Sequence, residues 1–298
     1  NYGRDAGVAL SNQVDADVLG TYATSTSTVD DGDIGGTDGN GIALTTSNVL
    51  AVIGAAKRKL QKQNIPMNNL YGVISPEFEE ILVQYGAGRD TSMGDDQNKN
   101  GFLMNFYGFK LHRSNQLSGS AVCAMATEPT ASDTVTIEGV VLTFVASPSA
   151  AGDIDLSGTV DTTRGYLASM INNPRTTSAT QIALTEANAR IFDNLTATND
   201  NTANTCTVVA KGVGVLNVAE TFTDGTDEWT AVDQKQHNLF GRNGAITLVL
   251  QSEPRVQPKE VQDKLGKNIL NGVLYGEKMF ADGAKQSVNV EIKSSTFA

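Results

Sequence analysis

The 298-residue sequence predicts an α+β fold in which a small α+β domain interrupts a larger α+β body. A strand leads directly into an amphipathic helix within Leu70–Tyr85, and Ser287–Lys293 alternates apolar and polar residues as a half-buried strand does. Charge is also uneven: residues 127–230 carry 13 acidic and 4 basic side chains, whereas the remainder carries 20 and 18. We therefore expect a body formed by residues 1–126 and 231–298, with an acidic insertion domain at 127–230 whose two ends lie close together at the surface.

The overall composition excludes several classes of protein. A net charge of −11 leaves no basic surface for gripping the phosphates of nucleic acid. No apolar run approaches the ~18 residues of a membrane span, and neither a membrane span nor a signal peptide is expected. Two cysteines, Cys123 and Cys206, allow a disulfide without requiring one, and they fit assembly in a reducing cytoplasm.

The first predicted helix is Ala6–Tyr22, whose apolar stripe consists of Ala6, Leu10, Val14 and Val18. The Asp- and Gly-rich passage Thr24–Gly41 is expected to be a mobile connector. A calcium loop is the alternative, because hard cations prefer clustered carboxylates. However, the twelfth position counted from Asp31 is Ile42 rather than the glutamate of an EF-hand.

A second helix is expected over Asn48–Gln63, capped by Thr46 or Ser47 and ended by Pro66. Its apolar face consists of Val49, Val52, Ile53, Ala56 and Leu60. Its last turns carry the basic residues Lys57, Arg58, Lys59 and Lys62. These could hold an anion, but the helix dipole and a solvated face explain them without a ligand.

The clearest unit is a short buried strand, Leu70–Ile74, that feeds a helix capped by Ser75 with Pro76 at its first position. The apolar face of this helix consists of Phe78, Ile81, Leu82 and Tyr85. A polar loop, Gly86–Asn100, should lead to a strand at Phe102–His112. In that strand Phe109 and Leu111 point one way, and Lys110 and His112 the other.

The acidic region has its own pattern of elements. "TVTIEGVVLTFV" predicts a hairpin around Glu138–Gly139, and "TCTVVA" predicts a further strand. A helix capped by Asp161 should run to Asn172, with Leu167, Met170 and Ile171 facing inward. These elements are sufficient for a small α+β module.

After Trp229 the sequence returns to the pattern of the body. "GAITLVLQSEP" is expected to be a strand closed by Pro254, and Pro258 should begin a short helix containing Val261 and Leu265. Ile269–Phe280 and Ser287–Lys293 are expected to be β segments.

No constellation of catalytic residues is recognisable. The two histidines, His112 and His237, lack metal-ligand spacing, and each is interpreted as a surface or interface residue. Gly212 and Gly214 lack the third glycine of a dinucleotide-binding loop and are interpreted as a strand bend. Asp153 and Asp155 resemble paired carboxylates but have no identifiable partner. We therefore predict no catalytic, cofactor-binding or metal-binding residues and no cofactor.

The order of motifs resembles a known family. "DAGVALSNQVDADVL", "LYGVISPEFEEIL", "GFLMNFYGFKLHRSNQL", "NGAITLVLQSEP" and "ILNGVLYGEKMFADGAKQSVNVEI" follow one another as in the major capsid proteins of tailed bacteriophages, which have the Hong Kong 97-type shell fold. The first helix is similar to the spine helix of that family, and the body to its P and A domains. The N-terminal arm and extended loop of the family have no counterpart here, so the chain, which starts at Asn1, is expected to lack an N-terminal piece. The stretch "DTVTIEGVVLTFVASPSAAGDIDLSG" is similar to a module of several phage structural proteins.

The resemblance implies assembly rather than catalysis. It implies a homo-oligomer of pentamers and hexamers that tile an icosahedral shell around packaged double-stranded DNA, assembled in the host bacterial cytoplasm and found in the virion. Decoration, scaffolding or portal proteins are the further partners that the family allows, while specific nucleic-acid binding and a membrane are not expected. Covalent crosslinking of neighbouring subunits is not expected, because in this family it needs a lysine of the extended loop. The acidic insertion is expected on the outer face, near the capsomer axis.

Two alternatives remain from the sequence. The first is another virion structural protein, such as a tail-tube or decoration protein, although tube proteins lack the spine helix. The second is a calcium-dependent enzyme carrying an acidic domain. Particle size separates these alternatives, because a shell protein forms megadalton particles or free capsomers.

Overall fold

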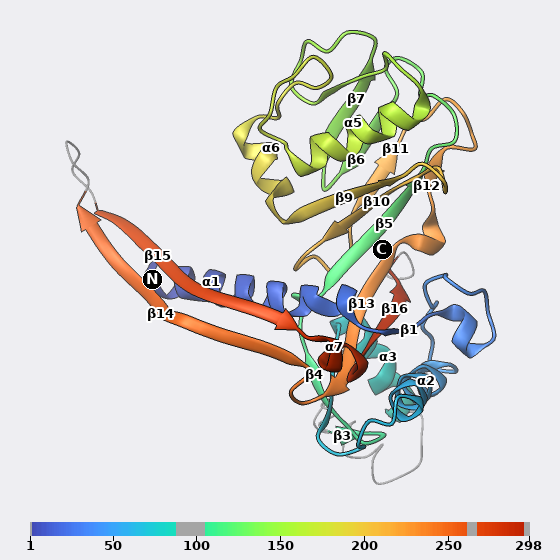
Figure 1. The fold of residues 1–298 in the computed structure, drawn as a ribbon, viewed down its shortest axis with the longest axis vertical. Coiled ribbons are helices and arrows are strands. Elements are labelled where there is room, and N and C mark those ends of the chain that lie inside the picture. The colour runs from blue at the N-terminus through green and yellow to red at the C-terminus, as the bar shows by residue number, and fades with distance from the viewer. Residues whose placement is uncertain (1, 88–104, 261–266, 295–298) are drawn as a thin grey trace. The chain divides into compact units, whose positions relative to one another are not determined.

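The computed structural model describes residues 2–87, 105–260 and 267–294, and it has the α+β architecture that the sequence predicts (Figure 1). The chain divides into two compact units. The first unit comprises Asn1–Gly36, Leu44–Leu117 and Asn238–Val290, and the second comprises Thr37–Ala43, Ser118–His237 and Glu291–Ala298. Each unit is described by itself below.

The sheet of the first unit is centred on β2 (Leu70–Ile74). β2 pairs in parallel with β4 (Phe109–Arg113) and antiparallel with the second half of β13 (Lys235–Arg242). A short strand, β3 (Asn105–Phe106), pairs with β4 across a turn at Tyr107–Gly108. The predicted single strand Phe102–His112 is therefore wrong: both turn residues have positive φ, and they reverse the chain into a hairpin.

Two helices of the first unit have the apolar faces that their spacing predicts. α2 (Val49–Lys62) buries all five predicted residues completely. In α3 (Pro76–Ala87), Phe78 and Leu82 are fully buried. The Phe78 amide donates a hydrogen bond to the Ser75 hydroxyl at 3.1 Å, which confirms Ser75 as the predicted cap. The cap predicted for α2 is wrong, because Asn48 occupies that position.

An aromatic contact joins α3 and the sheet. The ring of Phe240 on β13 lies 5.2 Å from that of Phe109 in an edge-to-face arrangement and 6.1 Å from that of Phe78. A side chain at Gly72 on β2 would meet the Phe240 ring at 2.7 Å, so glycine is required for this approach. This stack forms part of the core of the first unit.

The rest of the first unit includes α1 (Tyr2–Gly20) and a long two-stranded hairpin, β14 (Ile246–Glu260) with β15 (Lys267–Met279). The strand predicted to close at Pro254 instead continues to Glu260, and Pro258 pairs with Ile269 rather than starting a helix. Val261 and Leu265, predicted for that helix, lie outside the described residues, as does most of the predicted loop Gly86–Asn100.

Further short elements complete this part of the chain. The predicted connector Thr24–Gly41 contains β1 (Ser27–Val29), which pairs in parallel with β16 (Ser287–Lys293), and a 3₁₀ turn at Asp31–Ile34. α7 (Ala281–Lys285) links β15 to β16. On β16, Val288, Val290 and Ile292 are fully buried, as their alternation predicts.

The second unit contains a sheet and a smaller four-stranded sheet. In the first of these, β5 (Ser118–Ala124) pairs with β10 (Thr205–Ala210), which pairs with β9 (Leu195–Asp200). β5 also pairs with the first residues of β13 and with β12 (Glu228–Trp229). The smaller sheet has the order β11 (Val218–Glu220), β6 (Thr134–Ile137), β7 (Val140–Val145) and β8 (Asp153–Asp155).

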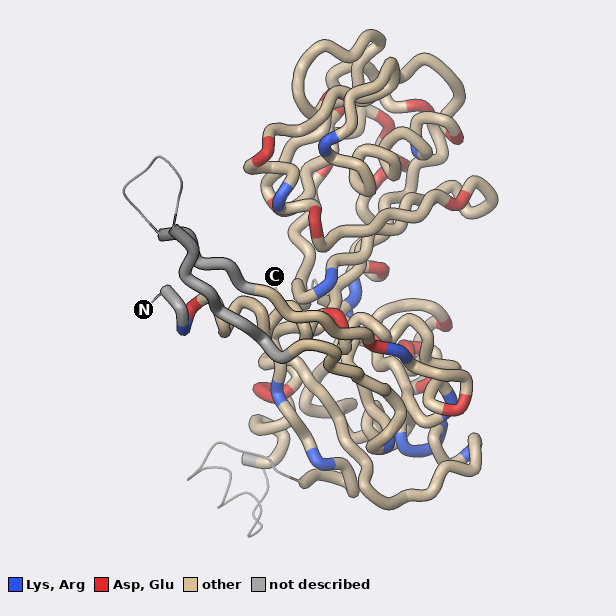
Figure 2. Tube along the Cα trace, turned by 60° about the vertical axis from the view of Figure 1, so that its left-hand side comes forward, with Lys and Arg blue, Asp and Glu red and all other residues tan. Residues whose placement is uncertain are grey.

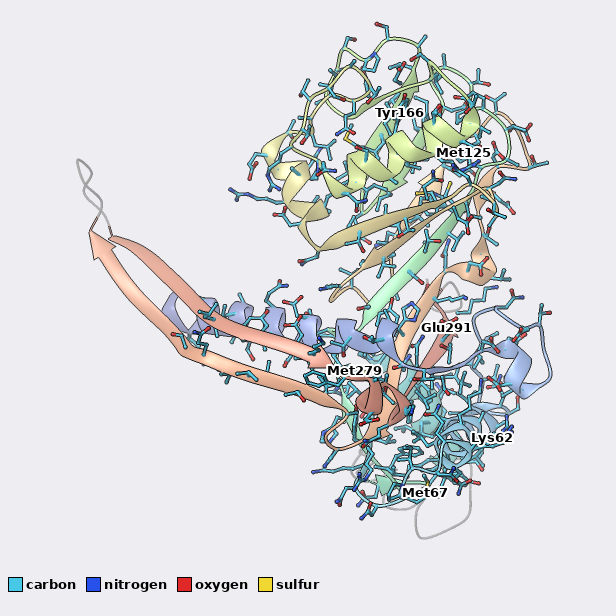
Figure 3. All side chains as sticks on the ribbon, in the orientation of Figure 1. Lys62, Met67, Met125, Tyr166, Met279 and Glu291 are labelled. Atoms are coloured by element: carbon cyan, nitrogen blue, oxygen red, sulfur yellow. The ribbon has the colours of Figure 1, made fainter. Side chains whose placement is uncertain are left out.

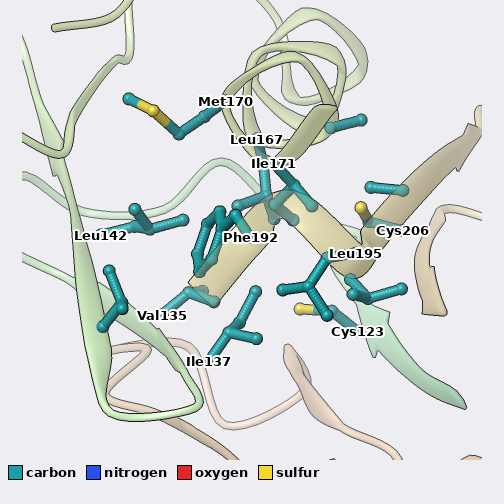
Figure 4. Close-up of a cluster of buried hydrophobic side chains, with 14 of the residues drawn as sticks. Cys123, Val135, Ile137, Leu142, Leu167, Met170, Ile171, Phe192, Leu195 and Cys206 are labelled. Atoms are coloured by element: carbon teal, nitrogen blue, oxygen red, sulfur yellow. The ribbon is translucent and has the colours of Figure 1, made fainter. Parts of the chain in front are cut away.

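The core of this unit lies between these sheets and the helices α5 (Val160–Asn172) and α6 (Glu186–Ile191) (Figure 4). Leu167, Met170 and Ile171 are fully buried, and the predicted hairpin turns at Glu138–Gly139 with positive φ at both residues. The helix is capped by Thr159 rather than by the predicted Asp161. The core also includes Cys123 and Met125, which precede the predicted insertion, whose boundaries 127–230 stay a prediction.

Candidate assembly surface

The two histidines have different environments. His112 is exposed on β4, as predicted. His237 on β13 is only 5% exposed, so its prediction as a surface or interface residue is wrong. Its imidazole Nε2 lies 2.9 Å from the Ser120 hydroxyl of β5. Ser120 and His237 meet because β5 pairs with β13. They are far apart in the sequence, so local patterns could not predict this contact.

Ser120, His237 and Glu291 are the residue types of a catalytic triad, but their arrangement fails the geometric test. His237 Nδ1 lies 3.9 Å from the carboxylate of Glu291 on β16 (Figure 3), which is longer than a hydrogen bond. Glu291 instead binds Lys235 Nζ at 2.8 Å. Ser120, which would be the nucleophile, is only 7% exposed, so a substrate could not reach it. We conclude that this polar cluster holds three strands together.

The paired aspartates of β8 serve their own loops. Asp153 accepts hydrogen bonds from the backbone amides of Ser149 and Ala150 at 2.8 and 2.7 Å, and Asp155 from that of Ser157 at 3.0 Å. Both aspartates are buried. A carboxylate used in this way fixes a turn, and it is not positioned as an acid or base.

The basic cluster of α2 has protein partners. Arg58 lies 3.6 Å from the Asp33 carboxylate, Lys59 also pairs with Asp33, and Lys57 Nζ donates to the Tyr107 carbonyl at 3.0 Å. These contacts show that the cluster, predicted to be a solvated face, is in part paired within the protein. They also use Asp33, a carboxylate of the passage that was predicted to be a connector. Across the described part of the chain, no group of three or more His, Cys, Asp or Glu could hold a metal ion.

The two cysteines are opposite each other on β5 and β10, and both are free thiols. Burial raises the pKa of Cys206 to about 12 and the pKa of Cys123 well above its ordinary value. Neither is therefore a nucleophile at neutral pH. Gly212, with a φ of 70°, lies in a turn after β10 rather than in a strand bend.

Neither of two pockets lined by described residues of the first unit pairs a histidine with a carboxylate. One of 450 Å³ is lined by Tyr71, Lys110, His112 and three asparagines. Burial raises the pKa of Tyr71 to about 12, so its phenol stays neutral. Another, of 410 Å³, lies beside Arg113, whose guanidinium is already 3.1 Å from Glu79.

The most unusual surface is the hairpin β14–β15, which we call the arm. In its register Ile246 is opposite Met279 and Leu250 is opposite Tyr275, so these side chains share one face. The Tyr275 hydroxyl donates to Asp17 of α1, which shows that this face is the one on which α1 packs.

Apolar side chains of the arm remain uncovered. Val249 and Leu274 lie on the face opposite α1 and are 59% and 54% exposed, and Phe280 beyond β15 is 55% exposed. Leu248 and Leu250, which share the face of Tyr275, are also exposed. A two-stranded hairpin is marginally stable by itself, and apolar patches of this kind mark contact sites.

The charge of the arm differs from that of the rest of the chain. Residues 246–279 carry five basic and four acidic side chains, a net of +1, whereas all other residues carry 17 and 29, a net of −12. The arm can therefore approach the acidic surface of a second copy without repulsion.

Within the described residues, no helix combines the length and the apolar character that crossing a bilayer requires. No curated protein matches the chain. A solved structure from Mycobacterium phage Che8 is similar, with 13% sequence identity and a TM-score of 0.48; the match covers 97% of this chain and 61% of that chain. The chain thus spans about three fifths of the length of that protein.

A family model described as phage capsid protein matches residues 1–178. That match covers more than half of the sequence, and it confirms the resemblance stated above. Its members are structural components of the virion and not enzymes. The chain belongs to the phage capsid protein family.

Proposed function

We propose that this chain is a shell subunit that self-assembles, as pentamers and hexamers, into an icosahedral capsid around packaged double-stranded DNA. Assembly takes place in the cytoplasm of the bacterial host. The observation that supports this proposal is the arm, because its exposed apolar residues and its charge suit contact with another copy of the same acidic chain. Decoration, scaffolding and portal proteins are the further partners of such a shell.

The acidic segment 127–230 is proposed to be an insertion domain on the outer face of the shell. Its ends are held side by side, since the Asp227 carboxylate accepts hydrogen bonds from the backbone amides of Ala126 and Thr127 at 2.7 and 3.3 Å. Adjacent ends are what insertion into a surface loop requires. Acidic positions, red in Figure 2, outnumber basic ones in this segment, which disfavours contact with packaged DNA.

Negative-stain electron microscopy and sedimentation of the expressed protein test the shell proposal. We expect megadalton particles or free capsomers. If the wild-type chain stays monomeric under all assembly conditions, the shell proposal is wrong. A small closed oligomer or a tube would instead favour a decoration or tail-tube protein. A density map that places residues 127–230 inside the particle would refute the outer location of the insertion.

A matched pair of variants tests the arm. Leu274→Lys places a charge on its exposed apolar face, while Val141→Lys makes the same change at a residue 51% exposed on β7. We expect both variants to keep the circular dichroism of the wild type, and only Leu274→Lys to lose particles. Normal particles from Leu274→Lys would remove the arm from the proposal but leave the shell function standing.

A further inference from the structure

The sequence contains four Asn–Gly pairs, and the fold holds them differently. An asparagine followed by glycine is prone to lose ammonia, because glycine has no side chain to keep its backbone amide away from the asparagine carboxamide. In this reaction the backbone nitrogen of the glycine attacks the carboxamide carbon of the asparagine. The side chains of Asn100 and Asn271 lie outside the described residues, so the structure compares Asn40–Gly41 with Asn243–Gly244.

The pair Asn40–Gly41 is restrained by the second unit. The Gly41 amide donates to the Val232 carbonyl at 3.0 Å, and Gly41 is buried. A Cβ at Gly41 would lie 3.1 Å from the backbone of Lys293, so there is little free space around this residue. The Gly41 nitrogen cannot turn toward the Asn40 side chain unless its hydrogen bond breaks. The fold therefore protects this pair.

The pair Asn243–Gly244 lies in the turn between β13 and β14 of the first unit (Figure 1). Both residues are exposed, and in the described part of the chain neither the Asn243 carboxamide nor the Gly244 amide makes a hydrogen bond. A Cβ placed on Gly244 would meet no atom within 4 Å outside its chain neighbours. The φ of 96° at Gly244 suits the third position of a type II turn, which glycine readily occupies. Both reacting groups are thus free and accessible to water.

The turn can open locally without disturbing the sheet. To bring its nitrogen to the Asn243 side chain, Gly244 must rotate about the bond between Cα and the carbonyl carbon of Asn243. The hydrogen bond that resists this rotation runs from the Ala245 amide to the Arg242 carbonyl at 3.2 Å, at the long end of the usual range. The Asn243 amide also donates to the Asn69 carbonyl at 3.0 Å, but that bond lies before the rotating bond and can persist. Openings of this size cost far less than unfolding.

We propose that Asn243 is a site of spontaneous modification in the folded chain. The Gly244 nitrogen forms a bond to Asn243 Cγ, and the bond from Cγ to Nδ2 breaks. The proton of the Gly244 amide passes through solvent to the departing nitrogen, which leaves as ammonia. Water then opens the resulting succinimide at one carbonyl carbon or the other. One product is aspartate, and the other is isoaspartate, in which the backbone runs through the former side chain.

The modification adds charge beside basic groups at the root of the arm. Asn243 lines the 450 Å³ pocket that Lys110 and His112 also line, so the new carboxylate faces positive charge. Aspartate at this position is therefore tolerated, with at most a small gain from an exposed ion pair. Isoaspartate instead adds one carbon to the backbone of the turn that leads into β14. Either product makes the net charge of −11 more negative by one.

Peptide mapping by mass spectrometry tests this proposal on the full chain, incubated at about pH 8 in water enriched in heavy oxygen. Hydrolysis of each succinimide incorporates one heavy oxygen atom, which identifies the modified asparagine. In the native chain we expect Asn243 to react at least about tenfold faster than Asn40, because breaking the Gly41 hydrogen bond adds to the barrier there. In guanidinium chloride, where the fold no longer distinguishes the pairs, the two rates should become similar.

A matched pair of variants checks the assignment. Asn243→Gln should remove the fast reaction, because the longer side chain must close a larger ring, whereas Asn40→Gln should leave that reaction unchanged. Circular dichroism confirms that both variants fold. Equal rates at the two pairs in the native chain, faster reaction at Asn40, or an unreactive Asn243 under conditions that modify the denatured chain would overturn the proposal. None of these outcomes bears on whether the chain forms shells.

Discussion

Asp227 offers the sharpest test of how the second unit is held together. Its side chain is 2% exposed, and it accepts from the Ala126 amide at 2.7 Å, the Thr127 amide at 3.3 Å and the Thr127 hydroxyl at 2.6 Å. The bonds join two segments about a hundred residues apart in sequence. Removing the carboxylate should therefore destabilise the whole unit rather than one turn.

The expected magnitude follows from these contacts. A hydrogen bond to a charged group contributes about 1.5–3 kcal/mol. Because Ala126 and Thr127 are themselves exposed, water can replace part of each bond, and we take the low end for the two shortest. Asp227→Ala should then lower the free energy of unfolding by about 3 kcal/mol. Asp227→Asn, which keeps an acceptor for both amides, should lower it by about 1 kcal/mol.

Urea unfolding followed by tryptophan fluorescence measures this effect. Trp229, the single tryptophan, is buried in the same unit, and its indole donates to the Ala219 carbonyl at 3.1 Å, so it reports on that unit. With a urea dependence of about 1.5–3 kcal/mol per molar, the Asp227→Ala midpoint should fall by about 1–2 M. Asp200→Asn is the control, because the exposed Asp200 of the same unit accepts hydrogen bonds from the nearby amides of Thr202 and Ala203. Equal midpoints for Asp227→Ala and Asp200→Asn would refute the reasoning.

Three further predictions concern other parts of the chain. Phe240→Ala, which opens the aromatic stack of the first unit, should cost about 3–5 kcal/mol in urea unfolding followed by circular dichroism, and a cost below 1 kcal/mol would contradict the packing. Because burial raises the pKa of Cys206 to about 12, a thiol reagent at pH 8 should label it only after unfolding, and rapid labelling of the native chain would contradict its burial. Arg175 forms ion pairs with Glu186 and Asp193 and lowers the pKa of both carboxyl groups. The two ion pairs therefore contribute fully to stability above the ordinary pKa values of 4.5 and 3.8, and this contribution is lost as pH falls through the lower pKa values of the native state. Arg175→Ala should therefore narrow the difference in melting temperature between pH 7 and pH 3, while an unchanged difference would show that the exposed pairs contribute nothing.

Local patterns in the sequence determined much of the fold. The five buried positions of α2, the Ser75 cap of α3 and the turn at Glu138–Gly139 follow from spacing and turn chemistry within a few residues. Such features depend on neighbours along the chain, so they can be read without the tertiary structure. Where local signals competed, the prediction failed. Pro258 was expected to start a helix, yet pairing with Ile269 keeps it in β14, because a proline can occupy a strand whose outer edge needs no donor.

The order of motifs also predicted the family, which the family match confirms, and the net charge predicted that the chain does not bind nucleic-acid phosphates. Only the tertiary structure decided which surfaces are closed and which are open. Asn172 and Ala197 meet because α5 ends beside β9, and His237 meets Ser120 because β13 pairs with β5. The exposure of Leu274 likewise depends on α1 packing on the other face of the arm. Contacts between strands and helices distant in sequence have no local signature, since each partner alone is an ordinary asparagine, histidine or leucine.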